Sequence, residues 1–310
     1  MTTAWVFPGQ GSQAIGMLAD LAAEFPTVQE TFAEASAALG KDLWLLAQQG
    51  PEAEINATEN TQPLLLTAGI AVWRTWLAQG GVRPQYMAGH SLGEYTALVA
   101  AGVLSLADGV KLVAERGRLM QAAVPAGQGA MAAILGLEDA QVVAACAEAA
   151  QGDVVSAVNF NSPGQVVIAG SAAAVDRAMA ACKAAGAKRA LPLPVSAPSH
   201  CALMLPAAEK LAAHLQSLTF HTPVIPVVQN VAARIEADAV ALQASLIAQL
   251  HSPVLWSQSV QWLAEQGVTR FIESGPGKVL TGLNKRIAKE AEHVSVESAE
   301  SLKAALALTE

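Results

Sequence analysis

Residues 87–99 read MAGHSLGEYTALV, and this stretch decides the fold. Apolar residues that predict a buried strand end at Gly89, and a helix-forming run follows from Glu94. Between them the pattern G-x-S-x-G places a glycine two residues before and two residues after Ser91, as in a nucleophile elbow. The glycines let neighbouring backbone pass close by, so the Ser91 hydroxyl would lie above a sheet at the positive end of the helix. The alternative is a glycine-rich turn with an incidental serine.

The alternation of strands and helices extends in both directions from this turn. Short apolar runs predict strands at 4–7, 87–88, 226–229 and 271–272. Helices are expected at 61–79, 93–101, 106–122, 203–218, 237–250 and 260–266, and further helices after Gly277. Strands that alternate with helices indicate an α/β fold, in which a mainly parallel sheet is covered on both faces.

The middle of the chain has a different order of elements. We expect strands at 130–135, 154–159, 165–169 and 190–195, and helices at 138–150 and 172–185. The order β-α-β-β-α-β is typical of a ferredoxin-like unit. The sequence therefore predicts a large domain of residues 1–124 and 197–310, with an inserted small domain of residues 125–196.

Composition narrows the class of protein. The chain has 310 residues, of which 53% are hydrophobic and 14% charged, and its formal net charge is −8. This is enough apolar side chain for a substantial core, and it argues against disorder. The acidic balance argues against a nucleic-acid coat, because phosphate binding needs surplus Lys and Arg. An anionic partner would have to meet a local basic patch.

Cysteines and hydropathy indicate the compartment. Cys146, Cys182 and Cys201 show no spacing typical of a zinc site or a disulfide framework, which favours a reducing compartment. The first basic residue is Lys41, so no secretory signal is expected. The apolar stretches are interrupted too often to cross a membrane. We expect a soluble cytoplasmic protein.

A serine nucleophile needs a base, and His200 is the first candidate. It lies where the small domain rejoins the large one, after Pro198 and just before a predicted helix, which favours a place in a cleft. His90 is adjacent to Ser91 but is expected to support the turn, and His214, His221, His251 and His293 are expected at surface or loop positions. No acid lies between Asp176 and His200, so a backbone carbonyl or an amide side chain such as that of Gln249 would orient the histidine.

Arg116 is a charged residue at a position where the helical pattern predicts an apolar, buried side chain. It lies on the helix predicted at 106–122, four residues after Leu112 and four before Met120, within the apolar stripe. A guanidinium there is at least partly desolvated and needs an anion, because a buried unpaired charge costs several kcal/mol, about 3–5. The alternatives are an arginine whose charged end reaches solvent and one that pairs with a distant Glu.

The N-terminal loop, FPGQGSQ at residues 7–13, also contains closely spaced glycines. Gly9, Gly11 and Ala14 fit the dinucleotide pattern G-x-G-x-x-A, but that fold needs a second strand ending in an acid about twenty residues on. Residues 27–38 read as a helix instead. A better use for the glycines is to present a backbone N–H to an oxyanion, together with the N–H of Leu92.

Six motifs together carry a resemblance over essentially the whole chain: FPGQGSQ (7–13), GHSLGEY (89–95), ERG (115–117), NFNSPGQVVIAG (159–170), PSH (198–200) and GPG (275–277). In this order they resemble the malonyl-CoA:acyl carrier protein transacylases of dissociated (type II) bacterial fatty-acid synthesis. The resemblance implies an α/β-hydrolase-like large domain with a ferredoxin-like insertion.

The same resemblance implies roles for individual residues. Ser91 would be the acylated nucleophile, His200 its base, and Arg116 the partner of the malonyl carboxylate. The N–H groups of Gln10 and Leu92 would form the oxyanion hole, and Gln249 would line the site and hold His200 through its carbonyl. The remaining residues expected to line the site are His90, Asn159 and Asn161.

The implied reaction moves the malonyl group from malonyl-CoA to the phosphopantetheine thiol of acyl carrier protein through a malonyl-serine ester. It needs no metal and no bound redox cofactor. The implied partners are malonyl-CoA and an acidic carrier protein, with no nucleic acid and no membrane, and a monomer is expected. Six basic residues are candidates for carrier docking, unless they are ordinary solvated charges: Lys183, Lys188, Arg189, Lys278, Lys285 and Arg286.

Three rival functions share some of these features. A serine esterase or thioesterase would use Ser91 and His200 but would need no cationic residue at Arg116. A polyketide acyltransferase could select another extender unit, such as methylmalonyl-CoA. A non-catalytic module that only binds carrier protein would not depend on Ser91 at all.

Overall fold

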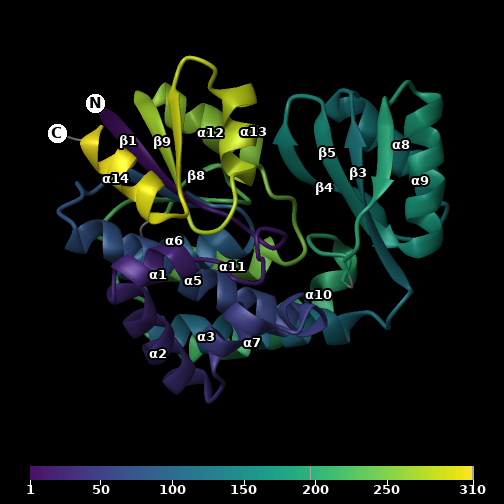
Figure 1. Ribbon diagram of the computed structural model, residues 1–310. Helices are drawn as coiled ribbons and strands as arrows, with labels where there is room; N and C mark the ends of the chain where they lie inside the picture. Colours follow the sequence, from purple (N-terminus) through teal and green to yellow (C-terminus); the bar gives the residue numbers. More distant parts are fainter. Residues whose placement is uncertain (196, 237, 309–310) are drawn as a thin grey trace.

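The computed structural model describes residues 1–195, 197–236 and 238–308 and contains two separate sheets (Figure 1). The larger sheet has the strand order β10-β9-β1-β2-β7-β8. Its pairs are parallel except for β7 with β8. The strands are β1 (Thr2–Phe7), β2 (Tyr86–Gly89), β7 (Val227–Gln229), β8 (Arg234–Ile235), β9 (Val268–Ser274) and β10 (Glu292–Val296).

Helices cover both faces of this sheet because β1 is apolar on both sides. Successive side chains of a strand point to opposite faces. Trp5 and Phe7 belong to one hydrophobic cluster with the helices that follow β1 and β2, and Trp5 packs against Trp73 and Trp76 at ring-centroid distances of 5.2 and 4.9 Å. Ala4 and Val6 belong to a second cluster with residues near the C-terminus. The predicted mainly parallel sheet, covered on both faces, is confirmed.

The helices of this part are α1 (Ala19–Glu24), α2 (Thr27–Leu39), α3 (Leu43–Gln49), α4 (Glu52–Ile55), α5 (Thr58–Ala78), α6 (Leu92–Ala100), α7 (Leu106–Ala123), α10 (Leu205–Gln216), α11 (Ala239–Gln249), α12 (Trp256–Glu265), α13 (Val279–Ile287) and α14 (Ala299–Ala307). A short 3₁₀ helix, Ala202–Met204, precedes α10. In the part of the chain that the structure describes, no helix combines the length and the hydropathy needed to cross a bilayer.

The smaller sheet is antiparallel, with the order β4-β5-β3-β6 (teal in Figure 1). It consists of β3 (Gly129–Leu135), β4 (Val155–Ser162), β5 (Gln165–Ser171) and β6 (Arg189–Pro192). The two helices α8 (Asp139–Ala150) and α9 (Ala172–Ala184) share one hydrophobic cluster with one face of the sheet. On the other face Met131, Val158 and Val167 form a cluster with Cys201. The predicted order β-α-β-β-α-β is therefore confirmed.

Two strands, β8 and β10, were not predicted from the sequence. β8 has two residues, and β10 was expected to be part of a helical region. β10 lies at the edge of the sheet and pairs with β9 alone among the described strands. Because most of its side chains are only half-buried, its sequence contains no apolar run that would predict a strand. Conversely, β4 continues to Ser162, where a turn was expected, and β6 ends at Pro192 rather than at residue 195. His293 lies in the edge strand β10, half-buried and stacked on Phe271, so it is not in a loop.

Other boundaries moved for local reasons. α11 begins at Ala239 because the Asp238 side chain accepts the N–H groups of Val240 and Ala241; the expected start at residue 237 lies outside the described residues. α12 begins at Trp256, four residues before its expected start. The domain boundaries at 124/125 and 196/197 stay a prediction, and residue 196 is likewise outside the described residues.

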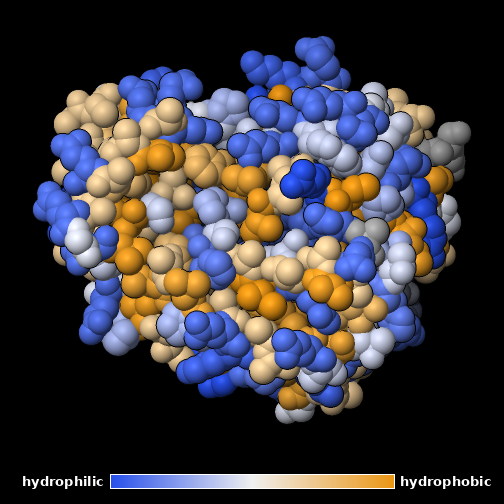
Figure 2. All heavy atoms as spheres, turned by 180° about the vertical axis from the view of Figure 1, so that it is seen from behind, coloured by the Kyte–Doolittle hydropathy of each residue, from blue (hydrophilic) through white to orange (hydrophobic). Residues whose placement is uncertain are grey.

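Hydrophobic residues also reach the surface. Figure 2 shows the back of the molecule, where groups of hydrophobic residues are broken up by hydrophilic ones. Large apolar side chains with the highest exposure include Val240 at 73% and Val224 at 70%. Exposed apolar side chains of this kind are ordinary in soluble folds and by themselves identify no binding surface.

Candidate active site

The turn between β2 and α6 holds Ser91 in a strained conformation. Ser91 has φ 53° and ψ −109°, a region that costs a residue with a side chain about 1–3 kcal/mol. A Cβ on Gly89 would overlap the backbone of Gly93, and a Cβ on Gly93 would overlap the backbone of Phe7. Both glycines are therefore required by close backbone approach, as the G-x-S-x-G pattern predicts.

His200 lies against the Ser91 hydroxyl. The distance between Ser91 Oγ and His200 Nε2 is 2.7 Å, and His200 Nδ1 lies 2.6 Å from the backbone carbonyl of Gln249. A carbonyl only accepts, so Nδ1 carries the proton and Nε2 is free to accept from the serine. Of the two orienting groups left open by the sequence, the structure has the backbone carbonyl.

Burial determines the charge of His200. The side chain is nearly inaccessible, and desolvation together with the charge of Arg116 lowers the pKa of His200 to about 3. The imidazole is therefore neutral at pH 7, which is the state that can take a proton from a hydroxyl or a thiol.

Arg116 reaches the same place from α7. Its exposure is 1%, so the alternative in which the charged end reaches solvent was wrong. Nη1 donates to Gln62 Oε1 at 2.8 Å and Nη2 donates to Gln249 Oε1 at 2.9 Å; Nη2 also lies 3.3 Å from Ser91 Oγ. The guanidinium carbon is 5.1 Å from the centroid of the Tyr95 ring. Its hydrogen-bond partners among the described residues are neutral oxygens.

The carboxyl group of Glu94 lies near these residues but does not line the cavity. Glu94 is fully buried on the first turn of α6, and desolvation raises its pKa to about 7, although hydrogen bonds and the charge of Arg116 oppose the shift. Within the described chain Arg116 and Glu94 form no ion pair at 4.0 Å or less. Burial also lowers the pKa of Arg116, yet a guanidinium stays protonated in proteins. The alternative of pairing with a distant Glu was therefore also wrong, and the guanidinium keeps its attraction for an anion.

A cavity of about 560 Å³ opens over these groups. Ser91, His200 and Arg116 line it, and the sequence-predicted residues that also line it are Gln10, His90, Leu92 and Asn159. Asn161 is placed differently, because its Oδ1 lies 2.7 Å from His90 Nε2. The Gln249 side chain is wholly buried beneath the site. The structure thus brings all nine predicted residues into one cluster, seven of them on the cavity wall.

The N-terminal loop closes one side of the cavity. Gln10 donates from Nε2 to Thr58 Oγ1 at 3.3 Å, and the Gly11 N–H donates to Gln13 Oε1 at 2.8 Å. Leu92 is the first residue of α6, and the N–H groups of a first helical turn have no partner within the helix. Gln10 and Leu92 therefore border the cavity from a loop and from a helix N-terminus.

Three residues of this site were not found from the sequence. Gln62 is a buried amide inside the apolar helix α5, and Asn230 follows the short strand β7; only these mismatches between residue type and burial could have marked them. Glu94 was used only to start a helix. Each contacts the site through residues more than 20 positions away, as the hydrogen bonds of Asn230 to Ser91 and of Glu94 to Gln249 show.

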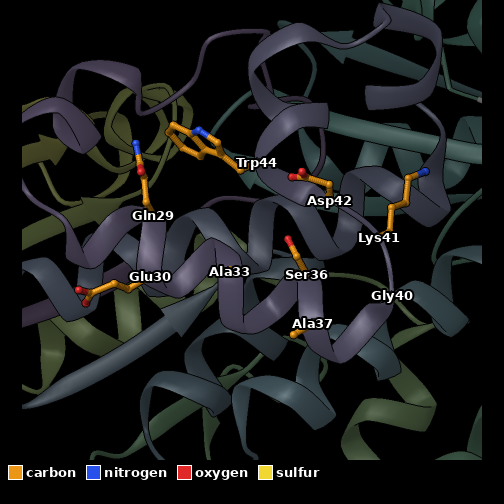
Figure 3. A pocket seen from close by; sticks show the side chains of 9 residues that line it. All are labelled: Gln29, Glu30, Ala33, Ser36, Ala37, Gly40, Lys41, Asp42 and Trp44. Atoms are coloured by element: carbon orange, nitrogen blue, oxygen red, sulfur yellow. The ribbon is translucent and has the colours of Figure 1, made fainter.

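A second hollow of about 750 Å³ lies between α2 and α3 (Figure 3). Three of its polar side chains are hydrogen-bonded to neighbouring parts of the chain. Ser36 Oγ accepts the Leu43 N–H, Asp42 accepts the Leu45 N–H, and Lys41 donates to Asn60 Oδ1. It holds no nucleophile next to a base, so it is no candidate active site. Across the described residues, no group of three or more His, Cys, Asp or Glu side chains could hold a metal ion.

Comparisons with known proteins agree with this geometry. The family model of the acyl transferase domain matches residues 4–303. The malonyl CoA-acyl carrier protein transacylase of Salmonella typhimurium is 62% identical over 303 residues, which is 98% of each chain. The structure of an acyl carrier protein S-malonyltransferase from Vibrio cholerae superposes with a TM-score of 0.96 at 60% identity, covering 98% of this chain and 99% of that one.

A further solved structure is a malonyl-transacylase in complex with its type II polyketide acyl-carrier protein. It is 57% identical, with a TM-score of 0.98 over 99% of this chain and 100% of that chain. Identity above half over nearly the full length, together with the Ser91, His200 and Arg116 geometry, leaves one assignment. The chain belongs to the malonyl-CoA:acyl carrier protein transacylase family.

Proposed function

We propose that the chain carries out its family's reaction, transfer of the malonyl group from malonyl-CoA to acyl carrier protein, through a malonyl ester on Ser91. One observation carries this proposal. A buried guanidinium lies 3.3 Å from the Ser91 hydroxyl, and its other hydrogen bonds in the described chain go to neutral amide oxygens. A serine beside a buried cation that has no ion-pair partner within 4.0 Å among the described residues suits an acyl group that has its own carboxylate.

In the first half-reaction, His200 Nε2 takes the Ser91 proton while Oγ attacks the thioester carbonyl. The N–H groups of Gln10 and Leu92 would stabilise the oxyanion, and the loss of one such donor typically costs about 3 kcal/mol of barrier. The C–S bond then breaks, and the proton on His200 passes to the sulfur. Coenzyme A leaves as the thiol, and malonyl-Ser91 remains.

The second half-reaction runs the same steps in reverse. The phosphopantetheine thiol of the carrier protein gives its proton to His200 and attacks the ester carbonyl. The C–O bond breaks, and Ser91 recovers its proton from the imidazolium. A neutral His200 can serve both halves because its pKa is far below 7.

Selectivity for malonyl over acetyl groups would rest on Arg116. A malonyl carboxylate would form charge-assisted hydrogen bonds with the guanidinium in a site screened from water. An acetyl group offers no anion and leaves the cation with amide partners only. Discrimination follows because a site built for a charged group rejects the analogue that lacks it.

Three of the six candidate docking residues, from two distant segments, lie toward one end of the small sheet. Arg189 and Gln165 both pair with Leu135, at one end of the small sheet. Arg286 of α13 donates to Gln165 Oε1 at 3.2 Å, so a basic residue of the large domain reaches the same end of the small sheet, with β3 between Gln165 and Arg189. Lys188 is at the same end, since its N–H donates to the Leu135 carbonyl. Such convergence supports a surface for an acidic carrier protein, whereas Lys278 is paired with Glu297 at 3.1 Å.

Two finer expectations are also proposals. We propose a cytoplasmic location, which the three cysteines support because all are free thiols. A monomer stays a prediction.

Intact-mass measurement after mixing with malonyl-CoA tests the central proposal. The wild type should gain one malonyl group and release it when carrier protein is added, whereas Ser91→Ala should gain none. A serine hydrolase would instead release free malonate without needing the carrier thiol, and a binding module would give no adduct. Comparing malonyl-CoA with methylmalonyl-CoA in the same assay distinguishes a malonyl-specific enzyme from a polyketide acyltransferase that prefers methylmalonyl-CoA.

A further inference from the structure

The strained turn at Ser91 is held by more than its own glycines. A residue with φ 53° keeps that conformation only where the surroundings determine it. Three backbone groups of the turn accept or donate to side chains from other parts of the chain: the Gly89 carbonyl, the Ser91 N–H and the Ser91 carbonyl. None of these side chains belongs to the cavity wall.

Asn230 bridges two of the three groups. Its Oδ1 accepts the Ser91 N–H at 2.7 Å, and its Nδ2 donates to the Gly89 carbonyl at 2.7 Å. β2 pairs with β7 only at Met87 with Val227 and Ala88 with Val228. The Asn230 amide therefore continues the sheet ladder past the last main-chain pair, with a donor and an acceptor in the positions that a backbone would offer.

Glu94 accepts hydrogen bonds from both residues that bond the turn, Asn230 and Gln249. Its Oε2 accepts the backbone N–H of Asn230 at 2.9 Å and Nε2 of Gln249 at 3.0 Å. The same Gln249 Nε2 donates to the Ser91 carbonyl at 2.9 Å. One buried carboxyl oxygen thus joins the backbone of Asn230 to the side chain of Gln249, and these two residues bond the turn. The other oxygen, Oε1, has no hydrogen-bond partner within the described residues.

We propose that Asn230 and Glu94 are positioning residues of the transfer reaction, which hold the Ser91 turn so that its hydroxyl stays on His200 Nε2. The inference rests on the proposed function of Ser91. Without the Asn230 amide, the Ser91 N–H and the Gly89 carbonyl lose their partners, and the turn can relax toward negative φ. Relaxation swings Oγ away from Nε2, while Arg116 keeps its bond to Gln62.

The test separates positioning from binding and from folding. The variants are Asn230→Ala and Asn230→Asp; the latter is isosteric, keeps the acceptor for the Ser91 N–H, and can donate to the Gly89 carbonyl only when its carboxyl group is protonated. The matched control is Gln229→Ala, which removes a buried amide one residue earlier whose Nε2 bonds only within β7. The readouts are single-turnover acylation by malonyl-CoA, labelling of Ser91 by an uncharged fluorophosphonate, and malonyl-CoA affinity in a Ser91→Ala background, each normalised to folded protein.

Asn230→Ala should slow both acylation and fluorophosphonate labelling by about 10- to 100-fold. Asn230→Asp should slow them less, and Gln229→Ala should leave them within about twofold. Malonyl-CoA affinity should stay within about threefold, because Gln62 and Gln249 still hold Arg116. Wild-type labelling rates in Asn230→Ala, or a loss matched by Gln229→Ala, would overturn the proposal.

Glu94 is tested by a pair of variants. Glu94→Ala removes the shared acceptor and should slow labelling about tenfold. Glu94→Gln keeps an amide oxygen for the same two N–H donors and should recover most of that rate; equal slowing in both variants would refute the positioning role of Glu94. A failure of the proposed function can be told apart from a failure of the positioning role. In the first case fluorophosphonate would label the wild type, but malonyl-CoA would leave no adduct. The labelling rates would still decide the role of Asn230.

Discussion

Replacing Arg116 with alanine tests the origin of malonyl selectivity. The guanidinium is 1% exposed, and it is held by amide oxygens of Gln62 and Gln249 at 2.8 and 2.9 Å. A substrate carboxylate bound there would form an ion pair that water cannot screen. Removing one partner of such a buried pair costs about 3–5 kcal/mol. At about 1.36 kcal/mol per tenfold, kcat/KM for malonyl-CoA should fall by about 10²- to 10⁴-fold.

Acetyl-CoA supplies the comparison, because it has no carboxylate to lose. Its kcat/KM should change by less than about tenfold in Arg116→Ala. Some change is expected, since Nη2 lies 3.3 Å from Ser91 Oγ and the charge of Arg116 lowers the pKa of His200. The ratio of malonyl to acetyl transfer should therefore fall by at least about tenfold.

The assay measures initial rates of coenzyme A release with each donor, per mole of folded protein. Normalisation matters because the variant leaves the oxygens of Gln62 and Gln249 without their donor. The control is Arg118→Ala, two residues further along α7, where an exposed arginine pairs with Glu115 at 2.6 Å. Equal losses with malonyl-CoA and acetyl-CoA would refute the carboxylate role of Arg116.

Three further predictions follow from charge and burial. Because the pKa of His200 is about 3, kcat/KM for malonyl-CoA should not fall between pH 7 and pH 5 as it would for an ordinary histidine; a midpoint near 6.5 in the rate profile would contradict the burial argument. Burial raises the pKa of Glu94 to about 7 from 4.5, so the folded state binds the extra proton between these values and stability is lost as pH rises through 7. The wild type should thus lose about 2–3 kcal/mol of unfolding free energy relative to Glu94→Gln between pH 5 and pH 8, measured by urea denaturation, and a constant difference would exclude this titration. Charge reversal at Arg189 and Arg286 should raise KM for the carrier protein and leave KM for malonyl-CoA unchanged, whereas reversal at Lys278, already paired with Glu297, serves as the control; an unaltered carrier KM in the double variant would remove this surface.

The local parts of this protein could be predicted from the sequence because their causes lie within a few residues. The Ser91 turn depends on glycines two positions away, and backbone contact at Gly89 and Gly93 is what demands them. The burial of Arg116 follows from the 3.6-residue period of α7, which places position 116 on the apolar stripe. Apolar runs likewise predicted most strands of the two sheets and the order β-α-β-β-α-β of the small unit along the chain, although not β8 or β10.

The tertiary structure decided whatever depends on groups that meet across long separations. The carbonyl that orients His200 comes from Gln249, 49 residues further on, and the amide that holds the Ser91 N–H comes from Asn230, 139 residues further on. Residue type says that such groups can donate or accept, but a buried amide has no periodicity that names its partner. β10 is recognised only through its neighbour β9, since a half-buried edge strand carries no apolar run of its own. The sequence therefore indicated Ser91, His200 and Arg116 as candidates, and packing decided which backbone and side-chain groups hold them in place, because hydrogen-bond partners in a buried site are chosen by distance in space and not along the chain.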